Sequence, residues 1–536
     1  MNITFLGAAK CVSGSCYLIE DDNLKFLIDC GLYQGSKELQ EYNYQKFNFN
    51  PATIDYVLLT HAHIDHSGLL PKLYKEGFRG KIIATSGTIE LCEILLPDSA
   101  HIQENEVKRK NKKNERAGRP LLFPIYTIND VNEVLKLFEK IEYDKELFLK
   151  DNLKVIFKNS GHILGSAYIE LYYFDKEKNK RIKIIFSGDL GHEYLSIIKK
   201  PEKALIADYL ILESTYGNRI HKIIDNNKKE EEIKKIIMEI ISKKGKLIIP
   251  AFAVERTQDL LFTLNKLFSN NELPEIPVYI DSPLAVEATK IFCKNTHYYN
   301  NETFQFIKND ITPFDLPNFN FIKTAEESMI LNDIDGPMII ISSSGMCEAG
   351  RIKHHLKHNL WKENNIVLFV GYQAEGTLGR RILDGEKIVR IHNEPVSVKA
   401  KIVNLESFSA HADRPMIISW LTNFIKFPYH IFLVHGEDIE LKGLKEAIIS
   451  NFSFDKIFIP EIGDKFEIIN EQTVKFKENI LKEKKSLKYL QYFNTYRKIK
   501  KYLKELIALR KSENAGEILE KELKEIAEKI ELLLKR

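Results

Sequence analysis

The residues best suited to chemistry stand together in one short stretch, Thr60-His61-Ala62-His63-Ile64-Asp65-His66. It offers three imidazoles and one carboxylate within six positions, directly after an apolar run. Imidazole and carboxylate together suit zinc, and the stretch has no thiolate with which to build a closed structural site. Because a loop after a buried strand is where an α/β fold exposes reactive side chains, the stretch predicts a metal site. The alternative is that these four residues are surface polar residues that stand together by chance.

Further ligand types follow apolar runs later in the chain. His162 lies between two glycines after one run, and Asp189 closes the next. Glycine lets a backbone approach a site closely, and ligands from several strand ends are how a metal pocket is assembled on a rigid sheet. Glu213, His411 and His435 also follow apolar runs, the last two far along the sequence. We therefore expect one sheet-based domain that another domain interrupts.

Asp29 ends the apolar run Phe26–Ile28 and precedes a glycine. One interpretation is a carboxylate that caps a turn. The other is a carboxylate that orients a ligating histidine, as such groups commonly do in metal sites. The second interpretation is favoured because the histidine loop follows so soon in the chain.

Length and composition restrict the class of protein. The 536 residues exceed one ordinary core, so two or three domains are expected. A net charge of +3 means that any nucleic-acid surface must be a local patch. Six cysteines without a close pair predict free thiols in a reducing cytosol. We expect a cytoplasmic protein, since there is no signal-peptide pattern and no apolar run near the ~20 residues that a membrane span requires.

The middle of the chain alternates apolar runs with helical patterns. The runs are Leu247–Pro250, Val278–Ile280, Met338–Ile341 and Ile366–Val370. This alternation predicts a parallel sheet in a domain of its own. Glycine-rich loops at 342–351 and 371–381 follow two of the runs and are either phosphate-binding loops or ordinary turns. Candidate contacts to a phosphate backbone are Arg256, Ser344, Arg351 and Arg380.

Two charged segments remain. The run from Ser99 to Arg119 is either a solvated face or a contact for phosphates. From Lys477 onward, apolar residues recur at spacings of three and four, which predicts a helical hairpin with one apolar stripe per helix. Such stripes must be buried, so the hairpin either docks on the body of the protein or mediates self-association, for instance as a homodimer.

Taken together, these motifs resemble a known family. The histidine loop, His162, Asp189 and Asp29 resemble the metallo-β-lactamase fold, and Glu213, His411 and His435 resemble the motifs added in its β-CASP nucleases. Segments similar to that family's inserted domain are Pro250-Ala251-Phe252-Ala253, Asp281-Ser282-Pro283-Leu284 and Ser343-Ser344-Gly345-Met346. The nearest relatives look like archaeal and bacterial homologues of the cleavage and polyadenylation specificity factor endonuclease.

The resemblance runs from Met1 to about Ile469 and implies a fold class. This is α/β, an αββα metallo-β-lactamase sandwich with an inserted parallel-sheet β-CASP domain and a C-terminal helical hairpin. The expected divisions are 1–218 and 399–475 for the sandwich, 219–398 for the insertion and 476–536 for the charged helical tail.

The resemblance also implies a site with two zinc ions. His61, His63 and His162 would hold one ion and Asp65, His66 and His435 the other, with Asp189 bridging them. His411, positioned by Glu213, would donate a proton to the departing 3′ oxygen of a single-stranded RNA, giving 5′-phosphate and 3′-hydroxyl ends. Asp65 and Asp29 would assist catalysis from within the site. A histidine at the last motif is typical of RNA-processing members, so His435 indicates RNA, cleaved internally or from a 5′ end.

Other functions stay open at this point. A DNA nuclease would use the same pocket chemistry. A non-catalytic RNA-binding subunit would be expected to have lost ligands, and here none is missing. A thioester hydrolase would not require Glu213 or His411, and a diiron enzyme would be expected to have Glu in place of His63.

Overall fold

The computed structural model describes residues 1–21, 24–175, 180–220, 226–308, 313–314, 316–374, 376–405, 408–470 and 472–481. The predicted helical hairpin at 476–536 lies almost wholly outside these residues. Within the described part of the chain, no helix combines the length and the apolar character that crossing a membrane requires.

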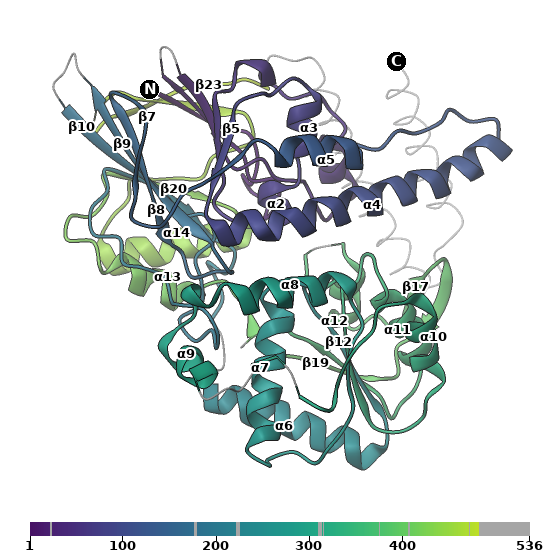
Figure 1. Cartoon of the computed structure of the whole chain (residues 1–536). Helices are drawn as coiled ribbons and strands as arrows, with labels where there is room; N and C mark the ends of the chain where they lie inside the picture. Colours follow the sequence, from purple (N-terminus) through teal and green to yellow (C-terminus); the bar gives the residue numbers. More distant parts are fainter. Residues whose placement is uncertain are drawn as a thin grey trace, which may run out of the picture.

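Two β-sheets packed face to face form the first structural unit (Figure 1). In the described residues, the order of one sheet is β23 (Val474–Asn479), β22 (Asp464–Ile468), β1 (Asn2–Phe5), β2 (Tyr17–Asp21), β3 (Leu24–Ile28), β4 (Tyr56–Leu58), β5 (Lys81–Ala84) and β6 (Phe138–Lys140). The order of the other is β21 (Ile457–Phe458), β20 (His430–Val434), β11 (Tyr209–Glu213), β10 (Lys180–Phe186), β9 (Ala167–Asp175), β8 (Leu153–Asn159) and β7 (Glu146–Lys150).

The core of this unit follows from side-chain alternation along the strands. In β11, Tyr209 and Ile211 enter the core between the sheets, and Leu210 and Leu212 point to the outer face. That outer face is covered by α13 (Arg414–Leu421) and α14 (Asp438–Phe452). The first sheet is covered by α3 (Leu70–Lys75), α4 (Ser86–Arg116) and α5 (Ile128–Leu135). These four layers confirm the predicted αββα sandwich.

An inserted parallel sheet forms the second unit. Its order in the described chain is β14 (Phe319–Phe321), β13 (Val278–Ile280), β15 (Met338–Ser342), β12 (Lys246–Pro250), β16 (Ile366–Phe369) and β19 (Lys401–Asn404). Neighbouring strands all run parallel. Because helices cover both faces, the central strands β15, β12 and β16 are buried along their whole length. The predicted β-CASP-type sheet is therefore confirmed.

The helices of this second unit divide between the two faces. One face carries α6 (Asn226–Lys243), α7 (Arg256–Ser269) and α8 (Pro283–Lys294). The other carries α10 (Ala325–Asp333), α11 (Ile352–Asn359), α12 (Leu378–Leu383) and the hairpin of β17 (Ile388–Ile391) and β18 (Glu394–Ser397). Strand β19 extends the inserted sheet past the division expected at 398, because a sequence pattern identifies a strand without identifying its neighbour.

The two units share one hydrophobic cluster, which runs from the outer face of the first sheet into the helices of the inserted sheet. Helix α4 packs along α8 at this junction (Figure 1). The side chain of Asn295 donates to Glu90 of α4, and the Lys229 ammonium donates to Ser196 of the first unit. Lys229 also pairs with buried Asp259 at 2.9 Å, which fixes α6 and α7 against the sandwich.

Helix α4 is much longer than the sequence indicates. The sequence leaves the charged run Ser99–Arg119 without a predicted secondary structure, whereas the observed helix continues through Pro97 to Arg116. The buried first turns include Leu91 and Leu95 and anchor the helix on the body. The later turns are rich in Lys, Arg and Glu, which are good helix formers. The segment therefore continues as helix without an apolar stripe of its own.

Candidate metal centre

Strand ends of the sandwich deliver the predicted ligands to one place. Strand β4 ends at Leu58, and the loop after it carries His61 and His63. The short helix α2 (Ile64–Ser67) follows and carries the next two ligands, Asp65 and His66. His162 lies in the loop from β8 to β9, Asp189 follows β10 and His435 follows β20.

Two glycines allow the loops of the site to lie directly against one another. A Cβ on Gly31 would stand 1.6 Å from the carbonyl oxygen of Asp65, so the turn after β3 touches the backbone of the histidine loop. A Cβ on Gly191 would stand 1.6 Å from the carbonyl oxygen of Gly161. That contact joins the Asp189 loop to the His162 loop. Any side chain at either glycine would separate the ligands.

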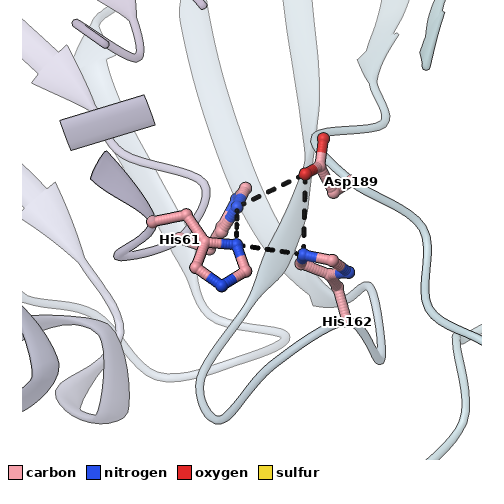
Figure 2. A group of neighbouring side chains, drawn as sticks. His61, His162 and Asp189 are labelled. Atoms are coloured by element: carbon pink, nitrogen blue, oxygen red, sulfur yellow. Dashed lines mark hydrogen bonds and ion pairs between the residues drawn. The ribbon is translucent and has the colours of Figure 1, made fainter. Parts of the chain in front are cut away.

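The first ligand group consists of His61, His63, His162 and Asp189. His63 Nδ1 lies 3.2 Å from both His61 Nε2 and His162 Nε2. Each of those two Nε2 atoms lies 3.5 Å from Asp189 Oδ2. Figure 2 shows His61 and His162 turned toward the Asp189 carboxylate. All four ligand atoms therefore converge on one point.

The second ligand group consists of Asp65, His66 and His435. His66 Nε2 lies 3.3 Å from His435 Nε2, which is 3.5 Å from Asp65 Oδ2. Asp189 also borders this group, because its Oδ1 lies 3.4 Å from His66 Nε2. The two oxygens of Asp189 therefore face different groups, which is the arrangement of a bridging carboxylate.

These donor sets fit metal ions. Tetrahedral ligands about 2.0–2.1 Å from zinc stand roughly 3.3 Å apart, which matches the spacing of the histidine nitrogens. Asp189 Oδ1 is buried and accepts no hydrogen bond from the described residues, a costly state for a carboxylate unless a cation occupies the space beside it. The His/Asp cluster is therefore a metal-binding site.

Asp29 supports two of the histidines. Its Oδ2 lies 2.7 Å from His66 Nδ1, which leaves His66 Nε2 directed at the second group. Its Oδ1 accepts from the backbone of Thr60, and the Thr60 hydroxyl, which donates to Asp29 Oδ2, lies 3.1 Å from His61 Nδ1. Asp29 has a φ of 59°, a left-handed conformation that the surrounding contacts must hold in place.

Burial keeps the first group of histidines neutral. It lowers the pKa of His63 to about 4 and takes the pKa of His61 well below its usual value, with the charge of His66 adding to the effect. The pKa of His162 is also far below its usual value, because of burial and then the charge of His411. Neutral imidazole is the form that binds a metal, so this group is prepared for one.

Around the second group, neighbouring charges outweigh burial in setting the pKa values. Burial alone would raise the pKa of Asp189, but His435 and His66 outweigh it and hold that pKa well below its usual range. Burial alone would lower the pKa of His66, but Asp189 and Asp29 raise it well above its usual value. A metal ion bound by His66 must therefore displace a proton, and its apparent affinity falls as the pH falls.

His411 and Glu213 stand together at the edge of this centre. His411 Nδ1 lies 3.4 Å from Glu213 Oε1 and 3.9 Å from Asp189 Oδ2. The Glu213 carboxylate is fixed, because it accepts hydrogen bonds from the backbone amides of Leu190 and Thr215 at 2.9 Å each. The His411 ring also packs on His162, with 4.4 Å between the ring centroids.

Arg256 differs from the other three predicted phosphate contacts, because two nitrogens of its guanidinium group are buried without a hydrogen-bond partner in the described residues. Arg256 is 5% exposed, and its Nε and Nη1 have no hydrogen-bond partner in the described residues. By contrast, Arg351 pairs with Asp281 at 2.6 Å and Arg380 with Asp384 at 2.8 Å. The Ser344 hydroxyl accepts from the amides of Glu348 and Ala349 within its own loop.

Arg256 lies beside the metal centre. Its charge is one of the influences that lower the pKa of His162, and its Nε is 3.9 Å from where a Cβ on Gly371 would stand. Burial above all raises the pKa of the adjacent Glu255 to about 8, and Asp259, the other carboxylate that acts on Arg256, is already paired with Lys229. Among the described residues, Arg256 is thus a buried cation without a hydrogen-bonded carboxylate of its own at Nε or Nη1.

Sequence reasoning missed several supporting residues. In the sequence, Thr60 is recognisable only as the residue before the first histidine, and nothing singles out Thr215, whose hydroxyl lies 3.0 Å from His435 Nδ1. Tyr216, whose ring lies 5.9 Å from that of His411, was also missed. Single Thr and Tyr residues carry no spacing signal. Their closeness in sequence to Glu213 is the only signal that could have identified Thr215 and Tyr216.

Comparisons with known proteins agree with this geometry. The chain matches the family descriptions "Metallo-beta-lactamase superfamily" over residues 9–90, "Beta-Casp domain" over 257–382 and "Zn-dependent metallo-hydrolase RNA specificity domain" over 395–460. It is 34% identical to Ribonuclease TTHA0252 of Thermus thermophilus over 448 residues, which cover 84% of this chain and 96% of that protein.

Two archaeal relatives are similar to a comparable degree. The RNase J-like protein of Methanocaldococcus jannaschii is 31% identical over 81% of this chain and 92% of its own length. Transcription termination factor FttA of the same organism is 30% identical over 84% of this chain and 69% of its own length.

Proposed function

Since the chain belongs to the β-CASP family of the metallo-β-lactamase superfamily, we propose that it is a zinc-dependent ribonuclease. Its substrate would be single-stranded RNA, hydrolysed to 5′-phosphate and 3′-hydroxyl ends. The single observation that carries the proposal is the convergence of seven ligands, with Asp189 between the two groups and the His411–Glu213 pair at the same place. The description of the family match at 395–460 as an RNA specificity domain supports RNA as the substrate, as does the presence of His435.

The proposed metals are two zinc ions. His61, His63 and His162 would hold one, Asp65, His66 and His435 would hold the other, and Asp189 would contact both. When bound, zinc supplies a Lewis acid that polarises phosphate oxygens and lowers the pKa of water toward neutrality. Asp29 is a positioning residue, because it fixes the tautomer and orientation of His66.

His411 is the proposed general acid. Glu213 accepts from its Nδ1, which orients the ring and leaves Nε2 to donate a proton to the departing 3′ oxygen. The fixed Glu213 carboxylate holds the His411 ring in one orientation. The pair is therefore arranged to protonate the leaving group beside the metal centre.

Arg256 is the proposed contact for the scissile phosphate. An unpaired buried cation costs several kcal/mol, and an anion that enters with the substrate removes that cost. The other predicted arginines have partners, and Ser344 is bonded within its own loop, so their contacts to substrate stay predictions.

Replacement Arg256→Met gives a prediction with two readouts. A charge-assisted hydrogen bond contributes about 1.5–3 kcal/mol, so kcat/KM for RNA should fall roughly 10- to 150-fold. The melting temperature should stay unchanged or rise, because the substitution removes an uncompensated buried charge. Zinc content should not change. Loss of folding, or full activity of the variant, would contradict this role.

The function itself is tested with the purified, zinc-loaded full chain on end-labelled single-stranded RNA, resolved on a denaturing gel. Cleavage to products with 5′-phosphate ends is expected, and DNA of the same sequence should be cut far more slowly. Circular RNA has no end, so its cleavage distinguishes internal cutting from digestion that begins at a 5′ end. Intact RNA after incubation would refute the proposal.

Two other expectations accompany this function. A cytoplasmic location is supported by the six cysteines, which are all free thiols. Self-association through the tail stays a prediction, because the tail lies outside the described residues.

A further inference from the structure

Helix α4 connects the metal centre to a distant charged surface. Its start is bonded to the His162 loop, because the hydroxyls of Thr85 and Thr88 both donate to the carbonyl oxygen of Gly165. With a rise of 1.5 Å per residue, Lys108 lies about 33 Å along the helix axis from Ser86. In Figure 1 this second half of α4 projects beyond α3 and α5, and the chain then returns alongside it to α5. We call residues 101–127 the α4 arm.

One side of the arm is covered by the returning chain. Asn111 donates to and accepts from the backbone of Leu122, and Asn114 donates to the carbonyl oxygen of Pro120. Glu104 accepts from the backbone amide of Ile128. These residues recur at helical spacing, so they define the face of α4 that the return segment occupies.

The remaining side of the arm carries positive charge. Its exposed cations are Lys108, Arg109, Lys112, Lys113 and Arg116. At 100° per residue these five positions span about 140° of the helix circumference. None of them takes part in an ion pair with another described residue, whereas Lys110, outside this face, pairs with Glu106 at 2.8 Å. A row of uncompensated cations is unusual in a chain whose net charge is only +3.

The arm also presents an aromatic side chain. Phe123 is 77% exposed in the return segment that Asn111 and Asn114 hold against α4. Exposed aromatic rings beside rows of cations are typical of surfaces that bind single-stranded nucleic acid, since bases stack on the rings while phosphates contact the cations. An acidic protein partner would use the cations and would have no comparable use for the ring.

We propose that the α4 arm binds the phosphate backbone of an RNA strand whose scissile bond lies in the metal centre. The inference rests on the proposed ribonuclease function and extends it, because it makes recognition depend on RNA length. A strand that spans the helix contacts both the metal centre and the arm, whereas a short oligonucleotide contacts only the metal centre. The arm would hold RNA without reading its sequence, because its contacts are charge and stacking.

The test compares two full-length triple variants that lose the same charge. The arm variant carries Lys108→Gln, Arg109→Gln and Lys112→Gln. The control carries Lys81→Gln, Lys136→Gln and Lys140→Gln, exposed lysines outside the arm that pair with Glu139, Glu133 and Glu142. Glutamine has nearly the helix propensity of lysine and the control positions are exposed, so both variants should fold. Binding is measured by fluorescence anisotropy in a His411→Ala background, which keeps RNA intact, with oligonucleotides of about 6 and about 30 nucleotides.

The arm variant should bind the longer RNA at least tenfold more weakly than the control at moderate salt. Its slope of log affinity against log salt should decrease by about 2, because roughly 0.7 counterions are released per phosphate contact of a single strand. The loss should be much smaller for the short RNA. Replacement Phe123→Ala should weaken binding of the longer RNA roughly tenfold without changing the salt slope.

Equal affinities and salt slopes for the arm and control variants would overturn the proposal. Tighter binding of poly-glutamate than of RNA would also overturn it, since that result would indicate an acidic protein as the occupant. These readouts are independent of cleavage. If the parent protein binds RNA through the arm but does not cut it, the ribonuclease function fails while the binding surface stands.

Discussion

Replacing Asp189 with Asn abolishes RNA hydrolysis and removes at least one zinc ion from the purified protein. This is the largest effect that we expect from a single atom, because Asp189 Oδ2 faces the first histidine group and Oδ1 the second. An amide presents one neutral oxygen and an NH₂ group, which cannot accept a metal. Metal analysis of the purified variant and gel assays of RNA cleavage are the measurements.

Asp29→Asn should reduce metal affinity less than Asp189→Asn does, so it is the comparison for this result. It leaves every metal ligand in place but removes the carboxylate that orients His66. Loss of such a supporting group typically costs 10–100-fold in metal affinity, so activity should return when zinc is added in excess. Asp438→Asn, at an exposed residue paired with Lys442, is the control and should behave as the parent. Full activity of Asp189→Asn at parental zinc content would refute the bridging role.

Zinc affinity should also depend on pH in a defined direction. The raised pKa of His66 means that its proton competes with the metal, so apparent affinity falls as the pH falls. Chelators should therefore strip the protein more readily in mild acid than at neutral pH.

Replacement His411→Ala lowers kcat by about 10²–10⁴, the usual contribution of a general acid, and leaves zinc content unchanged. Rate measurements under saturating RNA and metal analysis test both points, and RNA affinity should change little.

Glu213→Gln separates positioning from proton donation. The amide still occupies the space beside His411 but offers only an uncharged acceptor to Nδ1, so the ring is held less firmly and kcat should fall less than in His411→Ala. His297→Ala, at an exposed histidine of the second unit, serves as the control. An unchanged rate for His411→Ala would assign the leaving-group proton to another donor.

The sequence indicates the candidate metal ligands more clearly than it indicates their surroundings. His61, His63, Asp65 and His66 stand within six positions, so their spacing carried a strong signal. His435 is separated from them by more than 360 residues, and only the resemblance to a family joined it to the same site. The structure brings it within 3.3 Å of His66 because β20 lies beside β11 in the second sheet.

Other features lacked any local signal. The four residues of β19, Lys401–Asn404, do not indicate that its partner is β16 in the inserted sheet. The extension of α4 was missed because its later turns have no apolar periodicity, and helix prediction depends chiefly on that pattern. The unpartnered nitrogens of Arg256 also depend on three-dimensional packing, since nothing in the sequence distinguishes this residue from Arg351 and Arg380.

The pairing of β20 with β11 has a consequence for the synthesis of this protein. Until the ribosome has added residue 435, the nascent chain lacks one member of the second ligand group, although the histidine loop near residue 61 emerged long before. Strand β22, which pairs with β1, is translated later still. A polypeptide that stops before β20 therefore cannot assemble the second ligand group, so a complete centre forms only after translation has passed residue 435.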